Sequence, residues 1–291
     1  FRGTWYSIFH AISAFCNAGF DLMGHWQPYS SMTRYADDPL VLGTVMALIV
    51  LGGIGFFVWD DIAKNQWHFR NYTLQTKVVL TTTALLLILP FLWFWLCEFV
   101  HWNGMSTGKQ ALSALFQTVS PRTAGFNNVD LNQLSGGSKL LTILLMLVGG
   151  SPSSTAGGIK TTTLAILLLA LRAAFTSDHQ VHCFGRRIPA QVITRTLVVS
   201  VLYGTLFLVA SMALIQLEPV TMEEALFECA SAIGTVGLTL GITPELGAVS
   251  EGILILLMYL GRVGGLTLVY AVSGTGKRLH YTLPEESIGI G

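Results

Sequence analysis

The stretch "GGSPSSTAGGIKTTT", Gly149 to Thr163, separates two apolar runs, "LLTILLMLV" before it and "LAILLLAL" after it. Both flanks are apolar enough to lie in a bilayer, whereas the residues between them are mainly Gly, Ser and Thr, with one Pro and one Lys. Pro152 removes a backbone donor and breaks a helical ladder. Irregular backbone at membrane depth is tolerated only where it is buried in protein or lines a water-filled cavity. The stretch therefore predicts an interrupted membrane helix that faces water.

The composition agrees with a membrane protein. Of 291 residues, 52% are hydrophobic and 11% are charged, against about 25% charged residues in soluble domains. The formal net charge is zero, so nothing in the bulk charge indicates a nucleic-acid partner. The four cysteines form no CxxC pair, which argues against a zinc site and a disulfide framework. The expected surroundings are a lipid bilayer crossed several times.

Apolar runs of two lengths occur along the chain. Five are long enough to span a bilayer: Leu40–Trp59, Val78–Val100, Lys139–Leu171 with its interruption, Val192–Leu217 and Gly252–Val272. Three are too short to span and suit re-entrant helices: Tyr6–Phe15, Ala111–Val119 and Ala225–Ile233.

The distribution of Lys and Arg predicts the orientation. The loops after Trp59, Leu171 and Val272 hold nine of these residues, and the opposite side holds five. Cytoplasmic loops carry the excess of positive charge. The nine-residue side and the C-terminus are therefore expected to be cytoplasmic, and the three short apolar segments are expected to enter from outside.

Three segments of the chain align with one another around a shared glycine. They are "FHAISAFCNAGFDL" (Phe9–Leu22), "LFQTVSPRTAGFNNVDL" (Leu115–Leu131) and "LFECASAIGTVGLTLGI" (Leu226–Ile242). The glycines Gly19, Gly125 and Gly237 are 106 and 112 residues apart, and a second glycine cluster follows each inside a span. Self-similarity at a fixed period indicates a repeat architecture. The unit is a span, a re-entrant helix, an extended loop and a second span.

Repeated re-entrant loops imply one shared pore, because their backbone must face protein or water. Backbone carbonyls of such loops can replace the hydration shell of a cation, and the preceding helix directs its partially negative C-terminus at the cavity. Glycine allows backbone angles that a side chain forbids. The loop stretches "CNAGF", "TAGF" and "GTVGL" contain no carboxylate, which favours a monovalent cation over Ca²⁺.

Taken together, the motifs "FCNAGFDL", "SPRTAGFNNVDL", "SAIGTVGLTLG", "GGSPSSTAGGIKTTT" and "GRVGGLTL" resemble the Trk/Ktr/HKT superfamily of potassium transporters. The tail "LPEESIGIG" is similar to the end of the Ktr-type bacterial pore subunit. The resemblance implies an all-α polytopic membrane protein with membrane–pore-loop–membrane repeats around a pseudo-fourfold ion pore. It implies K⁺ uptake across the cell (plasma or inner) membrane, with no enzyme activity and no cofactor in this chain. It also implies a homodimer on a cytosolic nucleotide-binding, RCK-type regulatory ring.

The resemblance also assigns roles to individual residues. The filter loops correspond to Cys16–Phe20, Arg122–Phe126 and Gly234–Leu238. The ion-binding residues are Cys16, Asn17, Ala18, Gly19, Arg122, Thr123, Ala124, Gly125, Gly234, Thr235, Val236 and Gly237. The gating loop comprises Gly149, Gly150, Ser151, Pro152, Ser153, Ser154, Thr155, Ala156, Gly157, Gly158 and Lys160. Arg262 matches a pore-facing arginine of the last inner helix.

The chain begins inside a repeat. Residues 1–75 correspond to the second repeat without its first span, 76–190 to the third and 191–291 to the fourth with a cytoplasmic tail. Three loops cannot close a fourfold filter, so we expect an N-terminally truncated chain. The first loop, where family members differ in Ser versus Gly and in sodium tolerance, lies outside it. A sodium-permeable or Na⁺/K⁺-transporting relative therefore stays open.

A membrane enzyme with its site in the glycine-rich loop is the alternative from another class. Ser151, Ser153 and Ser154 could supply a nucleophile, but no His or acidic residue occurs within that span. Without a base beside the serine, the sequence predicts no catalytic site in the loop.

Several charged residues have two interpretations each. Lys160 either repels ions in the vestibule or pairs with an acid, unless it snorkels to the interface. Arg262 lies too deep to snorkel easily and is expected to face the pore or contact the gating loop, unless it is a structural arginine bonded to backbone carbonyls. Arg122 either anchors its own filter loop, Arg122–Phe126, through hydrogen bonds to carbonyls or lies at the outer surface. Asp21 and Asp130 either concentrate cations at the outer mouth or, slightly favoured, serve as turn residues.

Overall fold

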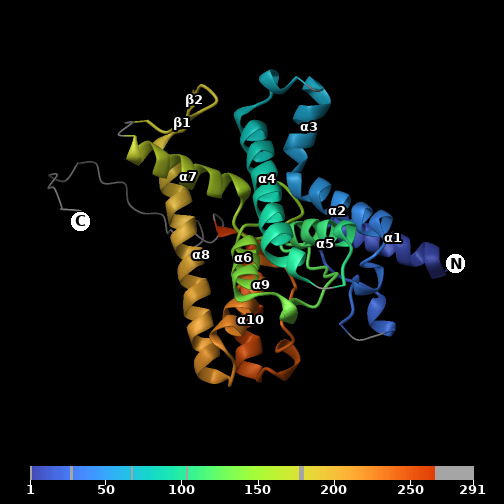
Figure 1. Cartoon of the computed structure of the whole chain (residues 1–291). Coiled ribbons are helices and arrows are strands. Elements are labelled where there is room, and N and C mark those ends of the chain that lie inside the picture. Colours follow the sequence, from blue (N-terminus) through green and yellow to red (C-terminus); the bar gives the residue numbers. More distant parts are fainter. Residues whose placement is uncertain (1, 27–28, 67, 103, 177–179, 266–291) are drawn as a thin grey trace.

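The computed structural model describes residues 2–26, 29–66, 68–102, 104–176 and 180–265 (Figure 1). Nearly all regular structure in these residues is helical, as the sequence predicts. The sequence did not predict the antiparallel hairpin of β1 (His182–Cys183) and β2 (Arg186–Arg187), which follows α7 (Thr161–Phe175). The expected cytoplasmic tail and the end of the predicted span Gly252–Val272 lie outside the described residues.

The three predicted re-entrant segments are the short helices α1 (Arg2–Phe15), α5 (Thr107–Val119) and α9 (Met222–Gly234). Each ends within one residue of its predicted end and begins three or four residues earlier than predicted. In α9 the early start has a clear cause, because Thr221 and Glu224 form a reciprocal capping box. Such a box satisfies two orphan backbone donors.

Within the described residues, two helices are long and apolar enough to cross a membrane. The first continues from α4 (Leu74–Trp93) through a π-helical turn to His101, and the second is α8 (Ala190–Leu217); each contains 28 residues. They match the predicted spans Val78–Val100 and Val192–Leu217. Both stand out in Figure 1, with α8 and α1 toward opposite sides of the molecule.

The stretch Leu40–Trp59 was predicted to be a single span, but it is not one continuous helix. The structure has α2 (Pro39–Ile54) and α3 (Phe56–Asn65), with a bend of 91° between them. Gly55 at the bend has φ +100°, a conformation that favours glycine. A Cβ on Gly55 would lie 2.5 Å from the Pro152 carbonyl oxygen. The bend therefore lies against the glycine-rich stretch.

The predicted interrupted span consists of two shorter apolar helices, α6 (Gly136–Leu147) and α7, with the glycine-rich stretch between them. The described part of the last predicted span is α10 (Ala248–Val263), which ends at Gly264 with φ +89°. Where α6 and α10 pass the short helices, small residues allow close approach, as is usual between membrane helices.

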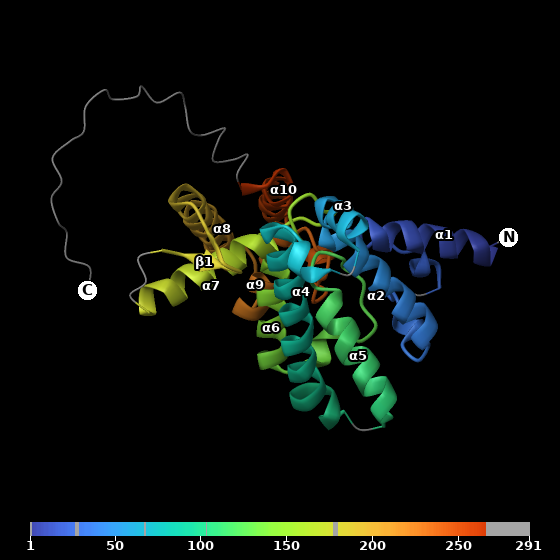
Figure 2. The same cartoon turned by 90° about the horizontal axis from the view of Figure 1, so that it is seen from above.

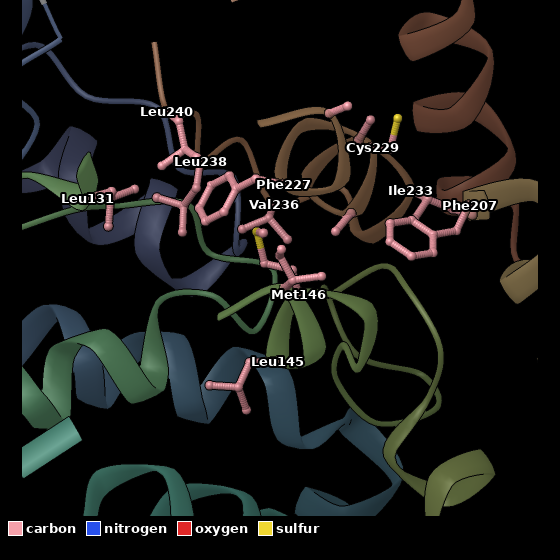
Figure 3. Packing of buried hydrophobic residues seen from close by; sticks show 14 of the residues in the cluster. Leu131, Leu145, Met146, Phe207, Phe227, Cys229, Ile233, Val236, Leu238 and Leu240 are labelled. Carbon is pink, nitrogen blue, oxygen red and sulfur yellow. The ribbon is translucent and has the colours of Figure 1, made fainter. Parts of the chain in front are cut away.

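Helix α9 packs against α6, α8 and α10, and α1 packs against α2 (Figure 2). The larger buried cluster surrounds α9, and Figure 3 shows Met146 beside Val236 and Phe227. A second cluster joins α1, α2 and α5. It includes the fully buried side chains Ala14, Leu42, Phe116 and Phe126. These contacts bring the loops after α1, α5 and α9 together.

Candidate functional site

The three predicted filter glycines share one backbone conformation and lie next to one another. Gly19, Gly125 and Gly237 have φ of +71°, +82° and +91°. A Cβ on Gly19 would lie 2.4 Å from the Ala124 carbonyl oxygen, and one on Gly125 would lie 2.0 Å from that of Val236. Each of these two glycines therefore abuts the residue just before the glycine of the next loop, where no side chain fits. Among the described residues, no heavy atom lies within 4 Å of a Cβ on Gly237.

A residue in the left-handed conformation precedes each glycine by two positions. These residues are Asn17 (φ +49°), Thr123 (φ +72°) and Thr235 (φ +55°). Left-handed backbone is uncommon for residues other than glycine and is unfavourable for β-branched threonine. The same strained turn in all three loops indicates one shared local structure. The aligned segments gave no signal for it, because threonine is not typical of this conformation.

A serine near the end of each short helix hydrogen-bonds the loop beside its glycine. Ser13 Oγ donates to the Phe20 carbonyl at 2.7 Å, and Ser120 Oγ donates to the Phe126 carbonyl. Ser231 Oγ accepts from the Gly237 N–H at 3.1 Å. Sequence analysis missed these serines. A signal was present, because each lies five or six residues before its glycine.

The loop carbonyl oxygens are left without protein donors. Those of residues 17–19, 123–125 and 235–237 accept no hydrogen bond from any residue that the structure describes. Ala18 and Gly237 are exposed, whereas Asn17, Thr123, Ala124 and Val236 are buried. A backbone carbonyl without a protein donor pairs with water or an ion instead. These oxygens are therefore available as cation ligands.

The first residues of the three loops are not alike. Cys16 is an exposed free thiol, and at Gly234 a Cβ would lie 2.2 Å from the Met146 carbonyl oxygen. Arg122 is only 8% exposed, so its predicted place at the outer surface was wrong. Its guanidinium also donates to no loop carbonyl among the described residues, and Nε has no partner there. The side chain instead lines a small cavity with Ile49, Val50, Gly53, Thr83, Val119 and Gly150.

The glycine-rich stretch is closed at its base. The Gly149 N–H donates to the Ile159 carbonyl at 2.8 Å, and the Ile159 N–H donates to the Leu147 carbonyl at 3.2 Å. The Thr161 N–H donates to the Gly150 carbonyl at 3.0 Å. A Cβ on Gly149 would lie 2.0 Å from a carbonyl oxygen of the returning strand. The two ends of the loop thus lie side by side, and the residues between them project away from α6 and α7.

The projecting part of the loop hydrogen-bonds the bend between α2 and α3. The Ser151 N–H donates to the Gly53 carbonyl at 2.9 Å, and the Phe56 N–H donates to the Ser153 carbonyl at 2.9 Å. These bonds use backbone groups that the bend leaves unpaired. The bend and the loop therefore satisfy each other.

Thr155 connects the loop to three other parts of the chain. Its Oγ1 accepts from Asn17 Nδ2 at 2.8 Å and donates to the Phe15 carbonyl at 3.0 Å. Its own carbonyl accepts from Arg262 Nη1 at 2.7 Å. Arg262 therefore contacts the predicted gating loop, one of the two places expected for it. Through Thr155, the loop touches the end of α1, a filter residue and α10.

The positively charged side chain of the loop, Lys160, forms a hydrogen bond within the loop. Lys160 Nζ donates to the Ala156 carbonyl at 2.7 Å. No carboxylate among the described residues forms an ion pair with it, so the predicted pairing with an acid was wrong. On the other side of the loop, a Cβ on Gly157 would lie 2.1 Å from Thr235 Oγ1. The loop therefore lies against residues of both the first and the third loop of this chain.

The two acidic residues near the loops have local roles. Asp21 Oδ1 accepts from the Met23 N–H at 2.7 Å. Asp130 accepts from the Asn132 N–H at 3.0 Å and from Gln133 Nε2 at 3.2 Å. These are the contacts of turn and cap residues, so the favoured interpretation is confirmed.

Comparison with known proteins gives a consistent assignment. The TrkH family profile, described as "Cation transport protein", matches residues 1–276. The potassium/sodium uptake protein NtpJ of Enterococcus hirae is 41% identical over all of this chain and 65% of its own length. The Ktr system potassium uptake protein B of Vibrio alginolyticus is 38% identical over 99% of this chain and 63% of its own length. The chain thus spans less than two thirds of these relatives.

A solved structure shares the fold. The potassium transporter TrkH from Vibrio parahaemolyticus matches 93% of this chain and 58% of its own, with a TM-score of 0.78 and 21% identity. The likeness supports a multi-pass helical membrane fold with pore-loop repeats. With the profile match across the chain and relatives of this identity, the chain belongs to the TrkH family of cation transport proteins.

Proposed function

We propose that this chain forms most of a K⁺ uptake pathway through a membrane. The ion would be held by the unpaired carbonyl oxygens of the three loops that carry Gly19, Gly125 and Gly237. The observation that carries the proposal is the mutual contact of these glycines beside carbonyls without protein donors. Carbonyl rings of this kind replace the hydration shell of a permeant ion. The names of the potassium uptake relatives support K⁺ as the cargo.

Each loop supplies its part in the same way. The short helix before it directs a partially negative C-terminus toward the loop. The left-handed residue and the glycine turn the backbone, and the helix serine fixes the loop at the glycine. We assign residues 1–75, 76–190 and 191–291 to three successive repeats. Cys16 and Arg122 would contribute backbone only, since their side chains lie elsewhere.

The loop from Gly149 to Lys160 would be the gate. It is an irregular segment between two apolar helices, and it lies against Asn17 and Thr235, which belong to two different filter loops. Hydrogen bonds from Asn17 and Arg262 to Thr155 would hold it across the path. Opening requires these bonds to break, so a regulator that moves α10 or the α2–α3 bend would shift the loop.

Orientation and partners follow from charge and from the names of relatives. We place α3, the hairpin and the C-terminus on the cytoplasmic side. In Figure 1 α3 and the hairpin lie at the same end of the molecule, and the rings of Phe69 and Phe184 meet there at 5.9 Å. The term "Ktr system" in a relative's name suggests more than one component. A homodimer on a cytosolic nucleotide-binding ring would supply the regulator.

Sodium permeation is the second candidate. The name of the Enterococcus hirae relative includes sodium as well as potassium. The loops described here contain glycine at all three central positions. A transport assay with both ions separates the two functions.

Deletion of Ser153–Gly157 in the intact protein tests the gate. It removes Thr155 with its bonds to Asn17 and Arg262 while leaving the base of the loop at Gly149. We expect higher K⁺ flux into proteoliposomes, measured with ⁸⁶Rb⁺, and an unchanged K⁺ over Na⁺ preference.

Lys109→Gln is the matched control, because its ion pair with Asp37 is exposed and remote from the loop. This variant should transport as the wild type does. Unchanged or lost flux in a correctly folded deletion variant would contradict the gating role. Absence of ⁸⁶Rb⁺ uptake by the wild type would contradict K⁺ transport itself.

A further inference from the structure

Two ionisable side chains occupy the same place in α1 and α9. His10 lies nine residues before Gly19, and Glu228 lies nine residues before Gly237. Both are buried within the protein, at 7% and 4% exposure. The corresponding residue of α5 is the fully buried Phe116. A buried polar side chain at this place needs a hydrogen-bond partner, and the partners of both residues lie in the segment that leaves the filter.

Both side chains accept hydrogen bonds from just beyond the filter glycine. His10 Nε2 accepts from the Leu22 N–H at 3.2 Å. Glu228 accepts from the Thr239 hydroxyl through Oε1 and from the Thr243 hydroxyl through Oε2 at 3.0 Å. Each side chain therefore ties the segment after its glycine back to the helix that precedes it.

The loop that carries Gly125 has a corresponding hydrogen bond to its helix, but between neutral side chains. Asn128, three residues after Gly125, donates through Nδ2 to Ser113 Oγ of α5 at 3.2 Å. In all three loops a side-chain hydrogen bond thus joins the segment after the glycine to the helix before it, but only the bonds at His10 and Glu228 involve an ionisable group.

The tie at His10 depends on the charge of the ring. Nδ1 lies 2.7 Å from the Tyr6 carbonyl, which can only accept, so Nδ1 carries the proton. Nε2 is then the acceptor for the Leu22 N–H. A protonated imidazole has two donors and no acceptor. Protonation at Nε2 would therefore place two N–H groups against each other and break this bond. At Glu228 the donors are the two hydroxyls and the Leu240 N–H, and a carboxyl group keeps an acceptor oxygen whether or not it is protonated.

The titratable and charged groups around His10 lie on α1 and on the segment that follows Gly19. Helix α2, which packs against α1, has no ionisable side chain between Pro39 and Ile54. Tyr6 is stacked on the ring with 6.1 Å between the centroids, and Asp21, next to Leu22 in the sequence, accepts from the Met23 N–H. Arg34 and His25 both lie against Trp26, whose ring contacts Tyr6. No carboxylate among the described residues pairs with His10.

We propose that His10 is a positioning residue of the filter loop that carries Gly19, and that its neutral form is required. The neutral ring holds the Leu22 N–H and thereby the segment after Gly19. Protonation of the ring releases this segment and lowers K⁺ uptake in acid. The effect on uptake rests on the proposed transport function, whereas the release of Leu22 does not.

Hydrogen exchange in the intact protein tests the release directly. Amide exchange of a peptide that contains Leu22 is measured by mass spectrometry at about pH 7.5 and about pH 5.5, the range in which histidine side chains change charge, with correction for the intrinsic rate. In the wild type we expect protection to fall about fivefold at the lower pH, as the loss of one net hydrogen bond implies. In His10→Gln, whose amide oxygen accepts without titrating, protection should not change with pH.

Uptake of ⁸⁶Rb⁺ at the same two pH values tests the consequence. Uptake by the wild type should be about fivefold lower at the lower pH than at the higher pH. Uptake by His10→Gln should be the same at both pH values. His101→Gln is the matched control, because His101 is exposed, and it should behave as the wild type does. Equal pH profiles of exchange for the wild type and His10→Gln would overturn the proposal.

The two possible failures can be told apart. A wild type whose Leu22 peptide keeps its protection in acid overturns the proposal whatever the variants do, including a His10→Gln variant that does not fold. A wild type that takes up no ⁸⁶Rb⁺ at neutral pH contradicts K⁺ transport, and the exchange experiment still decides the role of His10.

Discussion

Substitution of Gly125 by serine tests the filter most sharply. Gly125 has φ +82°, and a Cβ there would lie 2.0 Å from the Val236 carbonyl oxygen. Ordinary contact begins at 3.4 Å, so the next loop must retreat by about 1.4 Å if Gly125 stays in place. The obstructing atom belongs to the backbone and cannot rotate away. The serine would therefore displace one of the carbonyls proposed to bind the ion.

The energetic cost follows from two effects. A left-handed backbone costs a residue with a Cβ about 1–2 kcal/mol relative to glycine. Overlap with a packed neighbour that must shift costs about 1–3 kcal/mol more. The total is about 2–5 kcal/mol, divided between lower stability and a distorted filter. Each 1.4 kcal/mol that reaches the difference between K⁺ and Na⁺ binding changes the preference about tenfold.

The assay is competition between ⁸⁶Rb⁺ and Na⁺ in proteoliposomes that contain the intact protein, together with the melting temperature of the purified variant. We expect the preference for K⁺ over Na⁺ to fall at least about tenfold and the melting temperature to fall. Gly204→Ala is the control, because an added Cβ in α8 meets no heavy atom of the described residues within 4 Å. Alanine favours helix over glycine by about 1 kcal/mol, so this variant should be as stable as the wild type or more so. A Gly125→Ser protein with unchanged selectivity and unchanged stability would contradict the placement of Gly125 in the filter.

Two further substitutions address the gate and the scaffold. Thr155→Val leaves the Asn17 amide without its partner and weakens the closed loop by about 1 kcal/mol; we expect ⁸⁶Rb⁺ flux to rise about fivefold, and a flux no higher than that of the wild type would contradict it. Glu98→Ala removes the acceptor of the Ser135 N–H and hydroxyl and of the Trp102 indole. It should destabilise the protein by about 2–4 kcal/mol without changing selectivity, as a thermal melt and the competition assay would show; an unchanged melting temperature would count against this role.

Patterns within short stretches were sufficient to predict much of this protein. Apolar length identified α8 and the helix that begins with α4, since a span needs a fixed number of apolar residues. Alignment around Gly19, Gly125 and Gly237 identified the short helices to within a residue at their C-terminal ends. Pro152 and its neighbouring glycines marked the break between α6 and α7, because they cannot continue a helix.

Other features depend on what lies opposite in space. The segment around Gly55 was predicted to be an uninterrupted span. In the structure it bends against a carbonyl of Pro152, which is distant in the sequence. Pairing with an acid was one of the alternatives for Lys160, but its partner is a carbonyl four residues away. Arg122 turns inward to a cavity formed by residues from four separate segments. None of these partners is marked by spacing along the chain.

The membrane class, the repeated loop and the position of the broken helix could be predicted from the amino-acid sequence, because each depends on local composition and backbone freedom. Which groups meet depends instead on how the helices pack. Examples are the contact of Gly125 with Val236, the hydrogen bonds of Thr155 with Asn17 and Arg262, and the hydrogen bond between His10 and Leu22. The groups in these contacts have little specificity of their own. A carbonyl, an amide or a hydroxyl accepts many partners, and packing of the helices selects one.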